Sequence, residues 1–125
     1  MFFEERIAAM TQKMLRKTFY VVISKPLVAP DQLRPHLAAH LDYMIDLEKR
    51  GVVFASGPLA DGAGPPSGHG LTILRAASAE EARALAEGDP FFQNGLRSFE
   101  LKEWTVMEGT LGLRVNLSDQ TIDVA

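Results

Sequence analysis

Strand-like and helix-like segments follow one another along this chain in an order that few folds accept. Four segments rich in β-branched and aromatic residues have the character of strands: 18–25, 52–58, 71–76 and 98–108. Two segments have helical character, residues 30–50 and 78–89, and each ends beside a glycine. Ser78 and Glu81 have the spacing of a capping box at the start of the second helix. The predicted order is therefore β-α-β-β-α-β.

This order predicts an α+β fold of the ferredoxin-like type, with a four-stranded antiparallel sheet and both helices on one face. The other face of such a sheet is apolar and needs a cover. Either a helix predicted in residues 1–17 or a second copy of the chain can supply it, and we expect a homodimer that packs sheet on sheet. We expect the domain to span 18–108, followed by a tail at 109–125 that adds a short strand or an arm.

Composition narrows the classes of function. A chain of 125 residues suffices for one domain, and its net charge of −3 disfavours a nucleic-acid partner. The sequence has no cysteine, which excludes disulfides, thiolate metal sites and cysteine nucleophiles. Its longest apolar run, residues 19–23, is far shorter than the roughly 20 residues of a membrane span. Glu4 and Glu5 disfavour a targeting peptide, so we expect a cytoplasmic protein without a membrane partner.

Two histidines, His36 and His40, lie four residues apart on the first predicted helix. At about 100° per residue, an apolar stripe on this helix surrounds His40, while His36 falls at its edge. The residues of that stripe are Leu33, Leu37, Leu41, Met44 and Leu47. A buried imidazole without a hydrogen-bond partner costs about 1–3 kcal/mol, so the sequence predicts a partner for His40.

The spacing of the two histidines is also that of helix-borne zinc ligands. The intervening residues lack the glutamate of zinc proteases, and a third ligand would have to come from His69 or a carboxylate. We therefore expect neither a metal nor another cofactor, and we expect His69 to be exposed in the Gly/Pro-rich turn region at 59–70.

The stretch "EGDPFF" supplies a candidate partner for His40. Asp89 follows the end of the second helix, and the topology brings that end beside the first helix. Asp89 is then either a plain turn residue or the orienting carboxylate of a His40 general base. Phe91 and Phe92 would exclude water from such a pair.

Three stretches together carry a resemblance: "HLDYMIDLEKRGVVFASGPL", "GHGLTILRAASAEEARALAEGDPFF" and "FELKEWTV". The His-Leu within the helix, the later Gly and Gly-Pro, the "SAEEA" helix start, the Asp-Pro before an aromatic and the closing strand occur in order. On these landmarks the chain resembles the YCII family of small dimeric α-β barrel proteins, from about residue 18 to 107.

The resemblance implies a fold similar to that of muconolactone isomerase, usually without metal or organic cofactor. The family's His-Asp pair corresponds to His40 and Asp89. The resemblance to a member that removes chloride from a chlorinated hydroxyhydroquinone implies that this pair acts as a base and an orienting acid. Family members often carry an arginine three residues before the histidine. That position is Leu37 here, and the nearest arginine is Arg34.

Together these features predict a cofactor-independent lyase or isomerase, dehydrochlorinase-like, that moves a proton on a small oxygenated ring or lactone. His40 and Asp89 are the predicted catalytic residues, and the predicted substrate contacts are Ser56, Phe91, Phe92 and His36. We expect Trp104 to belong to the core because of its strand position. The alternative is a non-catalytic dimeric module that binds a small molecule.

Overall fold

The computed structural model describes residues 2–65 and 67–125, which fall into two compact units. One unit comprises residues 18–105, and the other comprises residues 1–17 together with 106–125. Within the described ranges, no helix has the length and apolar character that a membrane span requires.

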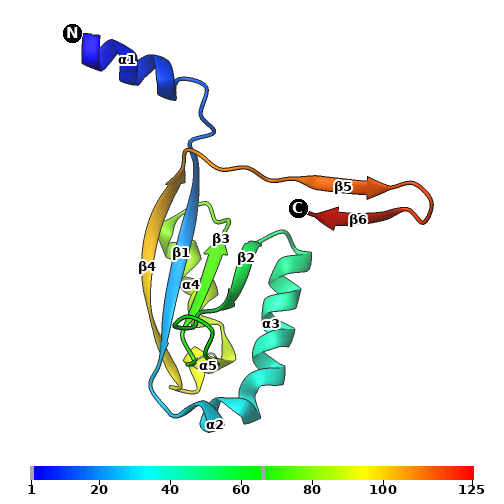
Figure 1. Cartoon of the computed structure of the whole chain (residues 1–125). Coiled ribbons are helices and arrows are strands. Elements are labelled where there is room, and N and C mark those ends of the chain that lie inside the picture. The colour runs from blue at the N-terminus through cyan, green and yellow to red at the C-terminus, as the bar shows by residue number, and fades with distance from the viewer. Residues whose placement is uncertain (1, 66) are drawn as a thin grey trace. The chain divides into compact units, whose positions relative to one another are not determined.

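The larger unit contains a four-stranded antiparallel sheet with the strand order β2-β3-β1-β4, as Figure 1 shows. Its strands are β1 (Lys17–Pro26), β2 (Val53–Pro58), β3 (Gly70–Leu74) and β4 (Arg97–Val106). The turn region between β2 and β3 includes Pro66, which lies outside the described residues. The order places the first and third strands at the centre, as a ferredoxin-like fold requires. The predicted α+β class is confirmed.

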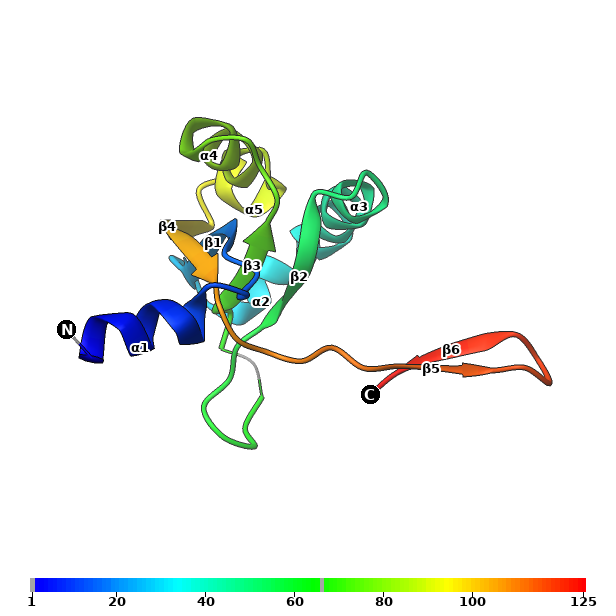
Figure 2. The same ribbon diagram turned by 90° about the horizontal axis from the view of Figure 1, so that it is seen from above.

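The helices α3 (Leu37–Lys49), α4 (Ala79–Glu87) and α5 (Pro90–Gln93) lie on the same side of this sheet, as Figure 2 shows. The prediction of one uninterrupted helix over 30–50 is wrong. The segment consists of α2 (Pro30–Leu33), a 3₁₀ turn (Arg34–His36) and α3. Pro35 lies within that turn, where its ring and missing N–H disfavour continuous α-helix.

Ser78 and Asp89 are the N-caps of α4 and α5. The predicted capping box at α4 is confirmed, because Ser78 Oγ accepts a hydrogen bond from the Glu81 N–H at 3.1 Å. The Glu81 carboxylate accepts from the N–H of Ala77 at 3.0 Å. Asp89 caps α5 by accepting from the Phe91 N–H at 2.9 Å. This short helix was not among the predicted elements.

The core lies between the sheet and the helices, where Tyr20, Val22, Leu74 and Ala82 are buried together. The face that α3 turns toward it differs from the predicted stripe. Leu47 is buried, but Leu37 and Leu41 are 44% and 46% exposed. Leu37, Leu41 and Leu47 all lie on α3, so the apolar stripe of this helix is wider than the face that packs on the core, and only the side of Leu47 points inward.

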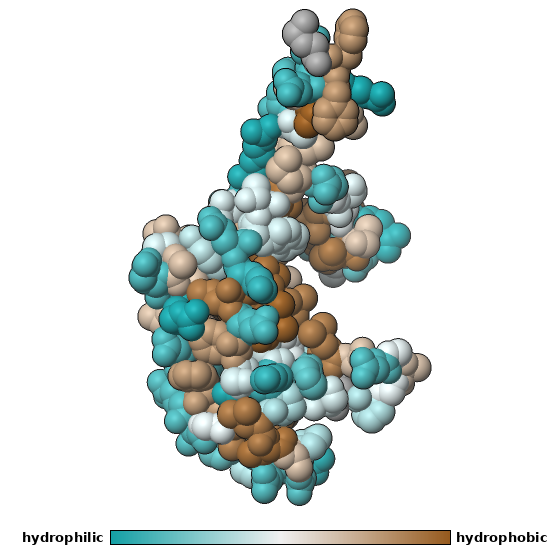
Figure 3. Space-filling model, turned by 90° about the vertical axis from the view of Figure 1, so that its left-hand side faces the viewer, coloured by the Kyte–Doolittle hydropathy of each residue, from teal (hydrophilic) through white to brown (hydrophobic). Residues whose placement is uncertain are grey.

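The opposite face of the sheet carries its own aromatic cluster. The ring centroids of Phe19 and Phe54 are 5.0 Å apart, and those of Phe19 and Trp104 are 6.1 Å apart. The expectation that Trp104 belongs to the core is wrong, because it is 41% exposed. Alternation along β4 puts it on the face away from Phe99 and Leu101, which contact the core. Figure 3 shows hydrophobic surface among the hydrophilic residues of this unit.

The smaller unit contains α1 (Phe2–Thr11) and a hairpin of β5 (Leu113–Asn116) with β6 (Thr121–Val124). No described residue of α1 is buried. In the hairpin, Leu113 pairs with Val124 and Val115 with Ile122, so all four exposed apolar side chains share one face. The tail thus forms a pair of strands where the sequence predicted a short strand or an arm.

The two faces of α3 predict different effects on stability. Leu47→Ala removes a side chain that is 1% exposed and is expected to lower the free energy of unfolding by about 2–5 kcal/mol. Leu41→Ala on the same helix is the matched control and is expected to cost well under half as much. Urea unfolding followed by circular dichroism measures both. Equal losses would contradict the assigned buried face.

Candidate active site

His40 lies in the first turn of α3 and contacts the short helix α5 through the ring of Phe91. Its side chain is 15% exposed, and its ring stacks on that of Phe91, with 4.3 Å between centroids and 21° between planes. Phe91 itself is 1% exposed. The imidazole is therefore held against a rigid aromatic wall while one edge remains accessible.

The predicted partner, Asp89, is in contact with this ring. His40 Nδ1 lies 2.8 Å from Asp89 Oδ1 and 2.9 Å from Oδ2. An ionised carboxylate only accepts hydrogen bonds, so Nδ1 carries the proton and Nε2 is the nitrogen left for other chemistry. Since Asp89 also caps α5, the same carboxylate sets the position of Phe91 and the tautomer of His40.

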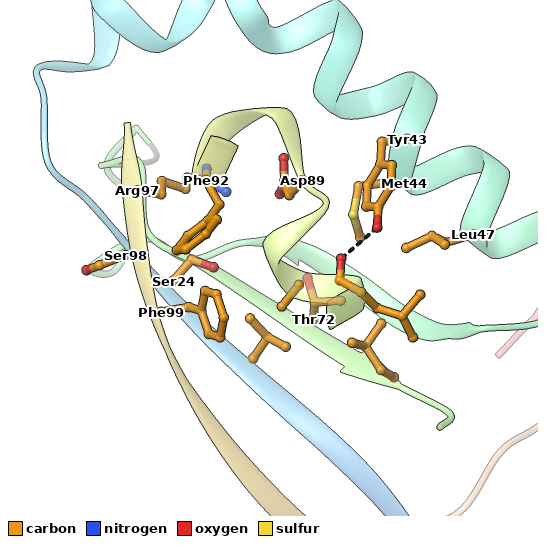
Figure 4. A pocket seen from close by; sticks show the side chains of 14 residues that line it. Ser24, Tyr43, Met44, Leu47, Thr72, Asp89, Phe92, Arg97, Ser98 and Phe99 are labelled. Carbon is orange, nitrogen blue, oxygen red and sulfur yellow. Dashed lines mark hydrogen bonds between the residues drawn. The ribbon is translucent and has the colours of Figure 1, made fainter. Parts of the chain in front are cut away.

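Tyr43, one turn after His40, packs beside the same carboxylate. Its hydroxyl donates a hydrogen bond to the Leu85 carbonyl at 2.7 Å, drawn as a dashed line in Figure 4. Burial, and secondly the charge of Asp89, raise the pKa of Tyr43 above its ordinary value. A β carbon at Gly88 would collide with this hydroxyl, so any larger residue where α4 ends would displace the Tyr43 side chain.

Arg97, the first residue of β4, was not singled out from the sequence. Its guanidinium carbon lies 4.5 Å from the centroid of the Phe91 ring. Burial lowers the pKa of Arg97, and the charge of Asp89 opposes that effect. Figure 4 shows Asp89 between Arg97 and Tyr43 at one end of a small internal cavity of about 30 Å³. The alternation of side chains along a strand could have identified Arg97 from the sequence, because it puts Arg97 on the same side of β4 as Phe99 and Leu101.

A groove of about 860 Å³ opens along α3 and the edge strand β2, and His40, Phe91 and Arg97 form part of its wall. The exposed leucines Leu37 and Leu41 also line it, which explains why they are not in the core. Its volume is ample for a single-ring molecule. The site thus combines an oriented imidazole, a guanidinium and an apolar groove.

The YCII-related domain model matches residues 18–105, which is most of the chain. The chain belongs to the YCII-related family. A solved structure of similar fold is the 5-chloro-2-hydroxyhydroquinone dehydrochlorinase of Burkholderia phenoliruptrix AC1100 in complex with 2,5-dihydroxybenzoquinone. It is 27% identical with a TM-score of 0.59, and the match covers 69% of this chain and 92% of that one. No curated protein matches.

The remaining predicted residues of this YCII-related chain lie at different places. Ser56 lines the groove, and its hydroxyl is 2.7 Å from that of Thr72. Phe92 lines the internal cavity and packs at 5.3 Å on Phe99. His36 is not among the described residues that line the groove. His69 is exposed, and its Nδ1 lies 2.9 Å from Ser67 Oγ.

The raised pKa of Tyr43 predicts a loss of stability at alkaline pH. The folded state holds the phenol proton more tightly than the unfolded chain, so this stabilisation is present below the ordinary pKa of 10.0 and is lost as the pH rises through the folded pKa. The free energy of unfolding of Tyr43→Phe is therefore expected to fall less steeply between about pH 8 and pH 11. Urea titrations across that range measure it, and identical slopes would contradict the assignment.

Proposed function

We propose that this protein is a cofactor-independent proton-transfer enzyme, a lyase or isomerase that acts on a small oxygenated ring or lactone. The observation that carries the proposal is the hydrogen bond from His40 Nδ1 to Asp89, at 2.8 Å, in the wall of an apolar groove. In the proposal His40 is the general base and Asp89 is its orienting partner.

The geometry of the pair supports this division of roles. With Nδ1 directed to Asp89, Nε2 takes a proton from a hydroxyl or an acidic C–H of a molecule in the groove. The carboxylate then stabilises the imidazolium that forms, and the stack on Phe91 keeps the ring from turning. The hydroxyl of Ser56 and the ring of Phe91 are the proposed substrate contacts, with Phe92 and His36 outside the groove wall. A base placed in this way contributes about 10²–10⁴-fold to a rate.

The similar dehydrochlorinase supports a lyase reaction as the first to test. Removal of HCl from a chlorinated hydroxylated ring requires loss of a hydroxyl proton and departure of chloride, with no external oxidant or reductant. A general base in a largely apolar groove suits the first of these events, because low polarity strengthens its interaction with the reacting hydroxyl.

The test is chloride release from 5-chloro-2-hydroxyhydroquinone, with other oxygenated rings and lactones assayed for proton exchange. His40→Gln and Asp89→Asn are expected to lower kcat by about 10²–10⁴-fold without a change of fold, because both remove the oriented base. Asparagine is also a good helix cap, so Asp89→Asn retains that role. His36→Gln is the matched control and is expected to retain activity. Full activity in His40→Gln would reject the proposal.

The alternative is a non-catalytic module that binds a small molecule. It predicts that ligands bind the groove but undergo no proton exchange, and that His40→Gln alters only affinity. Turnover of any substrate that is abolished in His40→Gln rejects this alternative.

We further propose that the protein forms a homodimer through the sheet face that carries Phe19, Phe54 and Trp104. Phe54 and Trp104 are 45% and 41% exposed, and a second copy would bury both. Trp104→Glu is expected to weaken the dimer at least about tenfold, because it buries a charge without a partner. Ala84→Glu, at an exposed position of α4, is the control. Light scattering over a concentration series measures the mass, and a monomeric wild type would overturn the proposal.

A further inference from the structure

The groove contains a cation that the proposed proton transfer does not use. Arg97 is half-buried, and its guanidinium lies 4.5 Å from the Phe91 ring centre, which in turn is 4.3 Å from the His40 ring. The side chain thus belongs to the same stack as the proposed base. A β carbon added to the groove residue Gly70 would lie 3.5 Å from Arg97 Nη1, in ordinary van der Waals contact, so the guanidinium lies directly beside the backbone of the groove wall.

Within the described part of the chain, no hydrogen-bonded anion neutralises the positive charge of Arg97. Its Nε is buried without a hydrogen-bond partner there, and no described carboxylate lies within ion-pair distance of it. Asp89 influences it only at longer range, since both carboxylate oxygens contact His40 and one also accepts from Phe91. A partly desolvated guanidinium without a hydrogen-bonded anion is costly, and a bound anion would relieve that cost.

The charges around the groove favour an anion as well. Of the described residues that line it, Arg34 and Arg97 are cationic, and Glu48 is the single carboxylate. Glu48 and Arg34 are exposed, so solvent screens both, whereas Arg97 is half-buried and contacts the same Phe91 ring as the proposed base.

We propose that Arg97 is the anion-binding residue of this groove and that the substrate class is an oxygenated ring that carries a carboxylate, phenolate or enolate oxygen. The guanidinium pairs with that oxygen and orients the ring toward His40. It also stabilises the negative charge that develops on the ring oxygens when His40 takes a proton. This inference rests on the proposed function for the site of proton transfer at His40. The binding of an anion by Arg97 does not depend on whether the protein is catalytic.

Affinity for two probes of equal shape and different charge tests the inference. The probes are 2,5-dihydroxybenzoate and its uncharged amide, 2,5-dihydroxybenzamide, titrated into the full chain and followed by NMR. Wild type is expected to prefer the benzoate. Arg97→Met is expected to weaken benzoate binding by about tenfold or more and to change amide binding by less than about twofold, because only the anion loses a charge-assisted hydrogen bond.

Arg83→Met is the matched control. Arg83 also lies over an aromatic ring, with 5.5 Å to the Phe99 centroid, but it lines a separate cavity beside α4. Its loss is expected to leave both affinities unchanged. Arg97→Lys keeps the charge without the planar guanidinium and is expected to give an intermediate preference, which guards against a folding defect in Arg97→Met.

The His40→Gln variant separates this inference from the proposed function. It is expected to lose turnover and to keep the preference for the benzoate. Equal affinity of wild type for the two probes, or no binding of the benzoate, overturns the inference. An equal loss for both probes in Arg97→Met also overturns it, whatever the activity assays give.

Discussion

The site depends on the hydrogen bonds that the carboxylate of Asp89 accepts. It accepts hydrogen bonds from the Phe91 N–H and from His40 Nδ1, so one side chain starts α5 and orients a ring on α3. Its charge also acts on Tyr43 and on Arg97, which come from α3 and β4. Groups from three separate elements thus lie around one anion, which fixes the direction of the His40 ring by a hydrogen bond and acts on Tyr43 and Arg97 through its charge.

The exposed apolar surface of the larger unit has two parts, and Phe54 borders both of them. On the helix side of the sheet, Leu37 and Leu41 remain exposed and form the wall of the groove. On the opposite side, Phe54 and Trp104 form part of an aromatic cluster. Large exposed apolar areas are unusual in monomers, so each is expected to have an occupant: a small molecule in the groove and a second copy on the sheet.

Local patterns accounted for the predictions that succeeded. Ser78 and Glu81 form their capping box because both partners lie within one helical turn. Where the outcome depended on packing, the patterns failed. The helical wheel put Leu37 and Leu41 in one buried stripe with Leu47, but of these three residues of α3 only Leu47 is buried. Trp104 lies on the wrong face for the core, because a strand pattern indicates alternation without saying which face meets the helices.

The sequence by itself determined the order of the elements, the α+β class and the family, since these follow from local propensity and from residues in fixed order. It also named Asp89 as a candidate partner of His40. Only the tertiary structure decided that these two meet at 2.8 Å, that Phe91 stacks on the imidazole and that Arg97 joins them. The reason is physical: His40 lies 49 positions before Asp89 in the chain, and its contacts depend on how the helices pack on the sheet, which no local pattern encodes.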